Sequence, residues 1–127
     1  LQVAMIYLVS GWDKLTSVAW KDGTALFNLL QVDFYATNWL QTLTEGVDLQ
    51  ILVVVSWMVI VFELLFPLVV WFPRLRYWML SLGILFHLFI ALGLSLPDFA
   101  LIMIWTYVVF AKQNDLIMVF KMIKGHA

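Results

Sequence analysis

The chain has 127 residues, of which 65% are hydrophobic and 12% are charged, with a formal net charge of −1. Soluble domains carry about 25% charged residues, and a water-soluble fold of this size cannot bury so much apolar surface, so the composition indicates a membrane protein. The near-neutral charge, without a basic stripe, excludes nucleic acid as a partner, and the absence of cysteine excludes disulfides and Cys-ligated metals within this chain.

The chain opens on an apolar run from Leu1 to about Leu15, which we predict to be a membrane helix. No positive flank or small-residue cleavage site marks this run as a signal peptide. We therefore expect a fragment of a longer protein, in which residues 1–127 form one membrane-embedded domain that lacks its N-terminal helices. The mixed segment Thr16–Asp48 alternates aromatic and charged residues, which indicates an interfacial or re-entrant segment. Within it we predict a short helix at Ala25–Val32 and irregular structure elsewhere.

Three further apolar stretches fill most of the remaining chain: Leu49–Trp71, Tyr77–Leu96, and a run from Pro97 to about Val119. Each is long enough, or nearly so, to cross a hydrocarbon layer of roughly 30 Å, which needs about 20 helical residues. In lipid only helices and closed barrels satisfy the backbone polar groups. The sequence therefore predicts an all-α fold, a polytopic membrane bundle of about four transmembrane helices plus the interfacial segment.

Basic residues predict the orientation of this bundle. Arg74 and Arg76 lie between the second and third predicted helices, and further lysines lie toward the C-terminus, whereas Asp98 begins the fourth helix without a basic neighbour. The positive-inside rule then places the Arg74/Arg76 loop and the C-terminus in the cytoplasm. Lys14 and the mixed segment are expected on the opposite side. The C-terminal lysines are Lys112, Lys121 and Lys124.

Glu63 and His87 are ionisable residues inside predicted membrane helices, where an unpartnered charge costs several kcal/mol. Each lies twelve positions from Leu75, near the turn between their helices, so both are expected at similar depth and could meet. One interpretation is a structural clasp between two helices, which contributes about 1 kcal/mol or less. The other is a direct role in proton or ligand handling. The two residues are too few for a metal site, so no metal is predicted.

Lys14 ends the first apolar run. Tyr7, Gly11 and Lys14 share one helix face at i, i+4 and i+7 spacing, and the glycine leaves room for a bulky neighbour. A partly desolvated amine on that face could act as a base near neutral pH. The alternative is a lysine that extends from a helix end toward water, which is common.

The segment YLVSGWDKL at positions 7–15, followed by WKDG at 20–23, resembles the signature of HTTM proteins, the bacterial relatives of the vitamin K-dependent gamma-carboxylase. Phe62-Glu63 with Pro67, then Phe86-His87, continue the pattern in the family's order, and the resemblance covers almost the whole chain. More distantly, the chain is similar to DoxX-like four-helix membrane proteins.

The resemblance implies a quinone-linked membrane enzyme of the bacterial inner membrane. In the carboxylase, the matching lysine deprotonates a hydroquinone, which implies a quinone or hydroquinone cofactor here. By the same comparison Lys14, Glu63 and His87 become the candidate catalytic residues. Other positions of the matching signature, Tyr7, Gly11 and Trp20, become candidate cofactor-binding residues. This chain departs from the carboxylase at Asp13, where that enzyme has a second lysine.

Two functional hypotheses follow. The first is a quinone-dependent, carboxylase- or epoxidase-like protein with Lys14 as base. The second is a noncatalytic membrane subunit or scaffold, in which the polar residues serve helix packing and the partners are lipids and other membrane subunits. A transporter has little support, because the sequence contains no inverted repeat.

Overall fold

A computed structural model describes residues 2–110, which are helical and contain no strand, so the predicted all-α class is confirmed for this part of the chain. The last helix is followed directly by a 3₁₀ turn at Tyr107–Phe110. The helices are α1 (Gln2–Thr16), α2 (Val18–Lys21), α3 (Thr24–Gln31), α4 (Asn38–Thr44), α5 (Leu49–Val69), α6 (Pro73–Gly93) and α7 (Pro97–Thr106).

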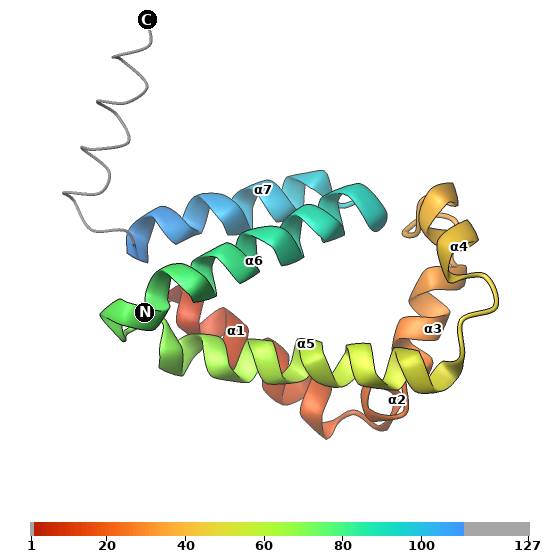
Figure 1. Cartoon of the computed structure of the whole chain (residues 1–127), viewed down its shortest axis with the longest axis horizontal. Coiled ribbons are helices and arrows are strands. Elements are labelled where there is room, and N and C mark those ends of the chain that lie inside the picture. The colour runs from red at the N-terminus through yellow and green to blue at the C-terminus, as the bar shows by residue number, and fades with distance from the viewer. Residues whose placement is uncertain (1, 111–127) are drawn as a thin grey trace, which may run out of the picture.

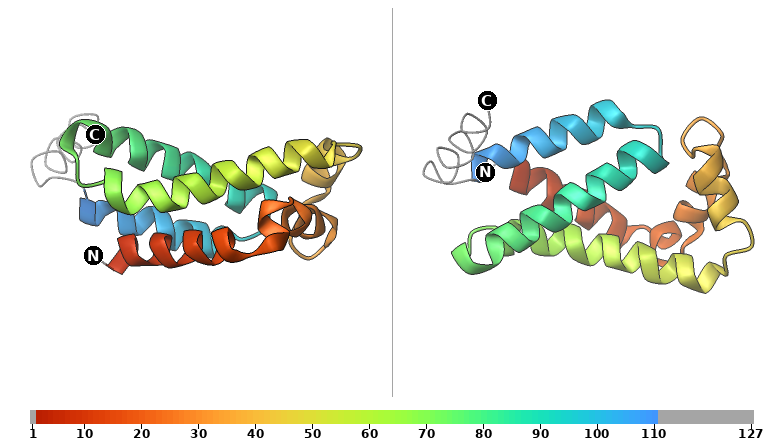
Figure 2. Two further views of the ribbon diagram at one scale, coloured as in Figure 1. Left: turned by 90° about the horizontal axis from the view of Figure 1, so that it is seen from below. Right: turned by 45° about the horizontal axis from the view of Figure 1, so that its top comes forward.

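The helices form two pairs that diverge from one end of the molecule. Helix α1 lies along α5, and α7 lies along α6 (Figure 1). The pairs approach each other near the turn that joins α5 to α6, and α2–α4 lie at the opposite, wider end (Figure 2). One buried apolar cluster fills the narrow end and includes Tyr7, Phe66 and Tyr107. A second cluster, built on Leu40 and Leu94, joins the short helices to the ends of α5 and α6.

Two helices in the described residues are long and apolar enough to cross a membrane: α5 and α6, with 21 residues each. A third apolar helix, Pro97–Phe110, is shorter, and the predicted continuation to Val119 lies outside the described residues. Many apolar side chains point away from the fold, among them Leu101, Trp105 and Val109 of the last helix. The length criterion therefore supports two of the four predicted spans.

The predicted boundary of the third helix was wrong by four residues. We placed its start at Tyr77, whereas α6 begins at Pro73. Proline is well tolerated at the first helical position, because its missing N–H has no intrahelical partner there. The turn before it is short, and Arg76 reaches back to donate from Nε to the carbonyl of Val70, 3.0 Å away. Arg76 thus satisfies one of the free carbonyls at the end of α5.

The mixed segment contains three short helices, so the prediction of one helix in an irregular segment was incomplete. The predicted helix at Ala25–Val32 corresponds to α3, and α2 and α4 flank it. A side-chain turn precedes α3: Asp22 Oδ1 accepts from the Thr24 amide at 3.0 Å and from the Thr24 hydroxyl at 2.6 Å. These bonds, the hydroxyl bond first, hold the pKa of the Asp22 carboxyl below its usual value. Gly23 between them adopts φ 79°, which favours glycine.

Candidate functional site

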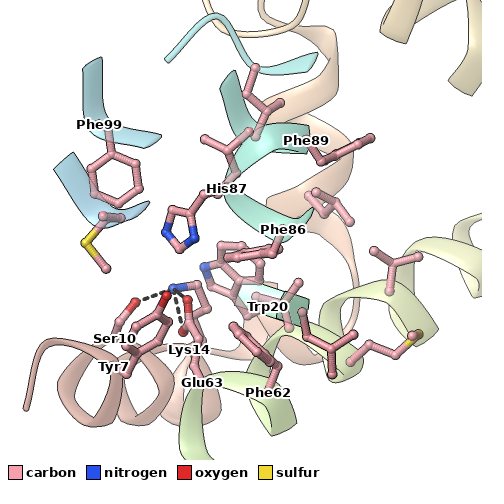
Figure 3. A pocket seen from close by; sticks show the side chains of 18 of the residues that line it. Tyr7, Ser10, Lys14, Trp20, Phe62, Glu63, Phe86, His87, Phe89 and Phe99 are labelled. Atoms are coloured by element: carbon pink, nitrogen blue, oxygen red, sulfur yellow. Dashed lines mark hydrogen bonds and ion pairs between the residues drawn. The ribbon is translucent and has the colours of Figure 1, made fainter. Parts of the chain in front are cut away.

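A cavity of about 560 Å³ lies between the two helix pairs, midway between the apolar clusters. Ligand sites in proteins commonly range from about 300 to 1,000 Å³. The polar side chains cluster in one region of the lining, as Figure 3 shows. They come from three long helices and α2: Tyr7, Ser10, Lys14, Trp20, Glu63 and His87.

Lys14 and Glu63 form an ion pair across α1 and α5. Lys14 Nζ lies 3.1 Å from Oε1 and 2.9 Å from Oε2 of Glu63, so the carboxylate receives a bond on each oxygen. The two side chains are 17% and 7% exposed. At such burial a charge persists because it is paired and hydrogen-bonded. The Lys14 side chain therefore points into the cavity instead of extending toward water. This position matches the helix face that Lys14 shares with Tyr7 and Gly11 in the sequence.

Two further groups surround the Lys14 ammonium. Ser10 Oγ accepts from Nζ at 2.6 Å, and the Trp20 ring lies beneath it with its centroid 5.0 Å away. An ammonium group has three protons and no acceptor capacity. Both oxygens of Glu63 and the oxygen of Ser10 use all three, while the aromatic face adds cation–π attraction. These contacts all stabilise the charged form of the lysine.

Gly11 makes the ion pair sterically possible. A Cβ on this residue would lie 3.0 Å from Leu64 side-chain atoms and 3.1 Å from Glu63 Cβ, closer than most real contacts. The missing side chain lets α1 approach α5 at the level of Glu63, within reach of Lys14. Gly11 is buried against α5 and is not among the cavity-lining residues, so its position is that of a packing residue.

His87 lies on α6, faces the ion pair on α1 and α5 (Figure 3), and is 1% exposed. Its Nδ1 lies 2.8 Å from the carbonyl oxygen of Gly83 and 3.3 Å from the Tyr107 hydroxyl. The Tyr107 hydroxyl also makes a short hydrogen bond to the hydroxyl of Tyr7. A polar chain thus connects α1, α6 and the 3₁₀ turn along one wall of the cavity.

Glu63 and His87 both line the cavity from adjacent helices, but no hydrogen bond joins them in the part of the chain that the structure describes. Glu63 pairs with Lys14, and His87 bonds to the Gly83 carbonyl and Tyr107. The direct clasp between the two residues, one interpretation of the sequence, is therefore not the arrangement found. Asp13, which precedes the lysine, makes no ion pair with Lys14 in these residues either.

The rest of the cavity is apolar. Aromatic rings surround the polar groups, and Phe86 and Phe99 both pack against the His87 ring, with centroids at 5.2 and 5.8 Å. The rest of the lining combines aliphatic side chains with further aromatic rings such as Phe89. A ligand that matches this lining has a polar group at one end and an apolar portion at the other. The apolar lining includes Leu26, Val55, Met58, Val59, Phe62, Leu82, Phe89, Ile90 and Leu94.

Sequence reasoning missed three participants: Ser10, Gly83 and Tyr107. Ser10 could have been found, because it lies four residues before Lys14 and so one turn away on the same helix face. Tyr107 gave no sequence signal, since it lies 20 residues from His87 and 100 from Tyr7. Only the packing of α7 on α6 brings it to the histidine.

These observations define a class: an apolar all-helical protein with a buried ion pair and a histidine lining one cavity. The chain belongs to the HTTM family, whose domain model matches residues 1–114. It is 31% identical over 123 residues to the sporulation-delaying protein SdpB of Bacillus subtilis (strain 168). That match covers 90% of this chain and 37% of SdpB, so the chain spans little more than a third of its relative. No solved structure matches the chain.

Proposed function

We propose that the chain is a membrane-embedded HTTM domain that binds a lipid-soluble hydroquinone, with Lys14 and Glu63 handling its proton. One observation carries the proposal: an ion pair and a histidine lie in one region of a cavity whose remaining walls are apolar. A hydroquinone has the matching chemistry, since its hydroxyl groups are polar and its ring and tail are not. When bound it would supply the electrons for redox or carboxylase-type chemistry.

The residues present fit such a group. The hydroxyl end suits the side of the cavity lined by Lys14, Glu63 and His87, and the aromatic side chains Phe62 and Phe86 suit a flat ring. For Lys14 to act as base, its ammonium must first lose a proton. The Glu63 carboxylate, 2.9 Å from Nζ, is the charged group that can take this proton, and the transfer leaves two neutral groups in an apolar site.

Lys14→Met and Lys14→Arg test this function in the full-length protein through hydroquinone oxidation. Methionine removes the amine, and arginine keeps the charge but does not release its proton. Because general-base catalysis contributes about 10²–10⁴-fold, we expect both variants to lose at least a hundredfold in turnover. Lys21→Met, at the end of α2, is the matched control and should retain activity. Unchanged turnover in both Lys14 variants would remove the lysine from the mechanism.

The same proposal includes four membrane spans. Helices α5 and α6 have the required length, and α1 and α7 lie alongside them with exposed apolar faces. The short helices α2–α4 would lie at the membrane surface opposite the cytoplasm. Arg74 and Arg76, in the first turn of α6, would lie in the cytoplasm by the positive-inside rule. Residues 1–127 then form one domain of a bacterial inner-membrane protein, with lipids as its immediate partners.

A second candidate is a noncatalytic subunit or scaffold within a larger membrane assembly. It is favoured by the apolar outer face of α7, where Trp105 is 77% exposed and Leu101 is 65% exposed. Lipid or a partner helix could cover this face. Glu63→Gln separates the candidates: a scaffold predicts weaker assembly, measured by crosslinking in membranes, with turnover unaffected. The proposed enzyme predicts lost turnover with assembly intact.

A further inference from the structure

The hydrogen bonds of the His87 ring determine which nitrogen carries its proton. The carbonyl oxygen of Gly83 can only accept, and it lies 2.8 Å from Nδ1. Nδ1 must therefore be protonated and donate to it. The Tyr107 hydroxyl oxygen, 3.3 Å from the same nitrogen, is then a second, weaker acceptor of this proton. The geometry thus assigns a proton to Nδ1.

The surroundings favour a neutral ring. His87 is 1% exposed and packs against Phe86, Phe99 and Tyr107. The charged groups that line the cavity are Lys14 from α1 and Glu63 from α5, and both are already paired with each other. A second cation would lie across from the Lys14 ammonium without a carboxylate of its own. Burying an unpaired charge is costly, so the imidazole is neutral.

A neutral ring with its proton on Nδ1 leaves a lone pair on Nε2. Among the described residues no hydrogen bond uses Nε2, and this nitrogen is not enclosed as an unpartnered buried atom. Figure 3 shows the nitrogen-bearing edge of the ring pointing into the cavity toward Lys14. Nε2 is therefore a hydrogen-bond acceptor that the protein itself leaves unused.

The hydrogen bonds of Tyr107 and Tyr7 run in the same direction, from donor to acceptor, as the bond from His87 Nδ1. With the Tyr107 oxygen accepting from Nδ1, its own hydroxyl proton is free to donate to Tyr7. The Tyr7 proton is then available to the cavity, which Tyr7 lines. An acceptor at Nε2 and a donor at Tyr7 together match a ligand hydroxyl, which can donate one bond and accept another.

We propose that His87 Nε2 is the acceptor for a hydroxyl group of the bound ligand, and that Tyr107 is the positioning residue that holds the ring in this tautomer. This proposal rests on the proposed function for the identity of the ligand, and it adds the atom of the protein that accepts the ligand's hydrogen bond. Lys14 was expected to accept the ligand's proton, but its ammonium has no lone pair, and all three of its protons already bond to Ser10 and Glu63. In the resting site, the free acceptor belongs to the histidine.

Gly83 permits this arrangement. A Cβ on Gly83 would lie 3.0 Å from the Tyr107 ring carbon Cε2 and closer still to its hydroxyl. The glycine therefore gives the tyrosine hydroxyl its place beside the backbone carbonyl that His87 uses. Gly83 thus acts twice. Its carbonyl oxygen accepts the bond from His87, and its missing side chain leaves space for Tyr107.

The first experiment reads the tautomer in the ligand-free protein by ¹⁵N NMR. The chain contains two histidines, so His126→Ala leaves His87 as its one reporter. We expect a protonated Nδ1 and an unprotonated Nε2 near neutral pH. Tyr107→Phe should bring the two ¹⁵N shifts closer together, because the ring loses one restraint, whereas Tyr35→Phe on the exposed α3–α4 loop should not. A proton on Nε2 overturns the proposal, and unchanged shifts in Tyr107→Phe remove its positioning role.

The second experiment adds decylhydroquinone or its dimethyl ether to the same labelled protein. The ether retains the ring and tail but cannot donate. We expect the hydroquinone to move the Nε2 resonance and the ether to leave it in place. Hydroquinone binding without a change at Nε2 overturns the acceptor role and leaves the proposed function intact. Absence of binding contradicts the proposed function, while the tautomer measured without ligand still decides the state of His87.

Discussion

At Lys14, an ammonium group, a carboxylate, a hydroxyl and an indole ring share one region of an apolar cavity. Moving two charges out of water is expensive, and their attraction repays this cost only with good geometry and further hydrogen bonds. Glu63 accepts on both oxygens, and Ser10 takes the remaining ammonium proton. The pair is therefore satisfied as a unit, and each member depends on the other.

A double-mutant cycle on Lys14 and Glu63 measures this dependence. Lys14→Met leaves the Glu63 carboxylate buried without a partner, and we expect a loss of about 3 kcal/mol in the free energy of unfolding. Adding Glu63→Gln removes the orphaned charge and should recover more than half of that loss. Thermal denaturation in detergent of Lys14→Met, Glu63→Gln and the double variant gives the three values that the cycle needs.

The control for the cycle is Lys21→Met, which makes the same substitution at the end of α2. Lys21 is half-buried but forms no ion pair within the described residues, so its substitution should cost about 1 kcal/mol or less. A loss in the double variant equal to the sum of the losses in Lys14→Met alone and Glu63→Gln alone would mean that the two side chains do not interact energetically.

At the scale of elements, the end of α6 is attached to the short helices by specific bonds. The last carbonyls of a helix lack intrahelical partners. The backbone N–H and the hydroxyl of Thr37 donate to the Gly93 carbonyl at 2.9 and 3.0 Å, and Trp39 Nε1 donates to the Leu92 carbonyl at 3.1 Å. The start of α4 thus caps α6, which holds the wide end of the cavity together.

Thr37→Val tests this attachment. The substitution removes the hydroxyl bond but keeps the shape, at a cost of about 1 kcal/mol. We expect amide hydrogen exchange at the C-terminal end of α6 to become about fivefold faster. Thr42→Val is the matched control, because the Thr42 hydroxyl bonds to Asn38 within its own helix. Equal exchange in both variants would show that the attachment does not depend on the hydroxyl.

At the scale of the whole molecule, the divergence of the two helix pairs creates the cavity. Close packing fills the narrow end with the cluster around Phe66, and the short helices close the wide end (Figure 2). The outer faces remain apolar, with Leu68 at 63% exposure and Trp78 at 74%. Contiguous exposed apolar surface of this kind marks contact with lipid or with another protein.

Cysteine labelling measures the proposed membrane orientation. The chain has no cysteine, so a single introduced thiol is the one labelling site within it. In the first turn of α6, Leu75→Cys keeps both neighbouring arginines, and Asn38→Cys places a thiol at the start of α4. In intact cells, an impermeant maleimide should label Asn38→Cys but not Leu75→Cys, and cell lysis should make both reactive. Labelling of both in intact cells contradicts the four-span orientation.

Much of the fold followed from local patterns. Apolar runs predicted α1, α5, α6 and the start of α7, because helix is the state that satisfies the backbone within such a segment. Boundaries were less predictable. Helix α6 begins at Pro73, where proline suits the first helical position, and Arg76 bonds back to Val70 at the end of α5. The short helices α2 and α4 were missed. Helix α2 is only four residues long, and α4 is attached at its start by hydrogen bonds from Thr37 to the distant Gly93.

For the candidate site, too, some features could be predicted from the sequence and others could not. The shared helix face of Tyr7 and Lys14 and the ionisable residues Glu63 and His87 could be identified from the sequence, because polar groups in apolar segments need partners. Which partners they take could not be identified. Glu63 was expected near His87 by depth, yet it pairs with Lys14, because Gly11 lets α1 lie closer to α5 at that level.

The sequence by itself determined that the chain is helical, strongly apolar, and similar to HTTM proteins, because these properties depend on composition, period and local motif. The tertiary structure alone decided that Lys14 is paired and His87 retains an open nitrogen. The physical reason is distance along the chain: Tyr107 and Tyr7 are separated by 100 residues and Lys14 and Glu63 by 49, and only helix packing brings their atoms together.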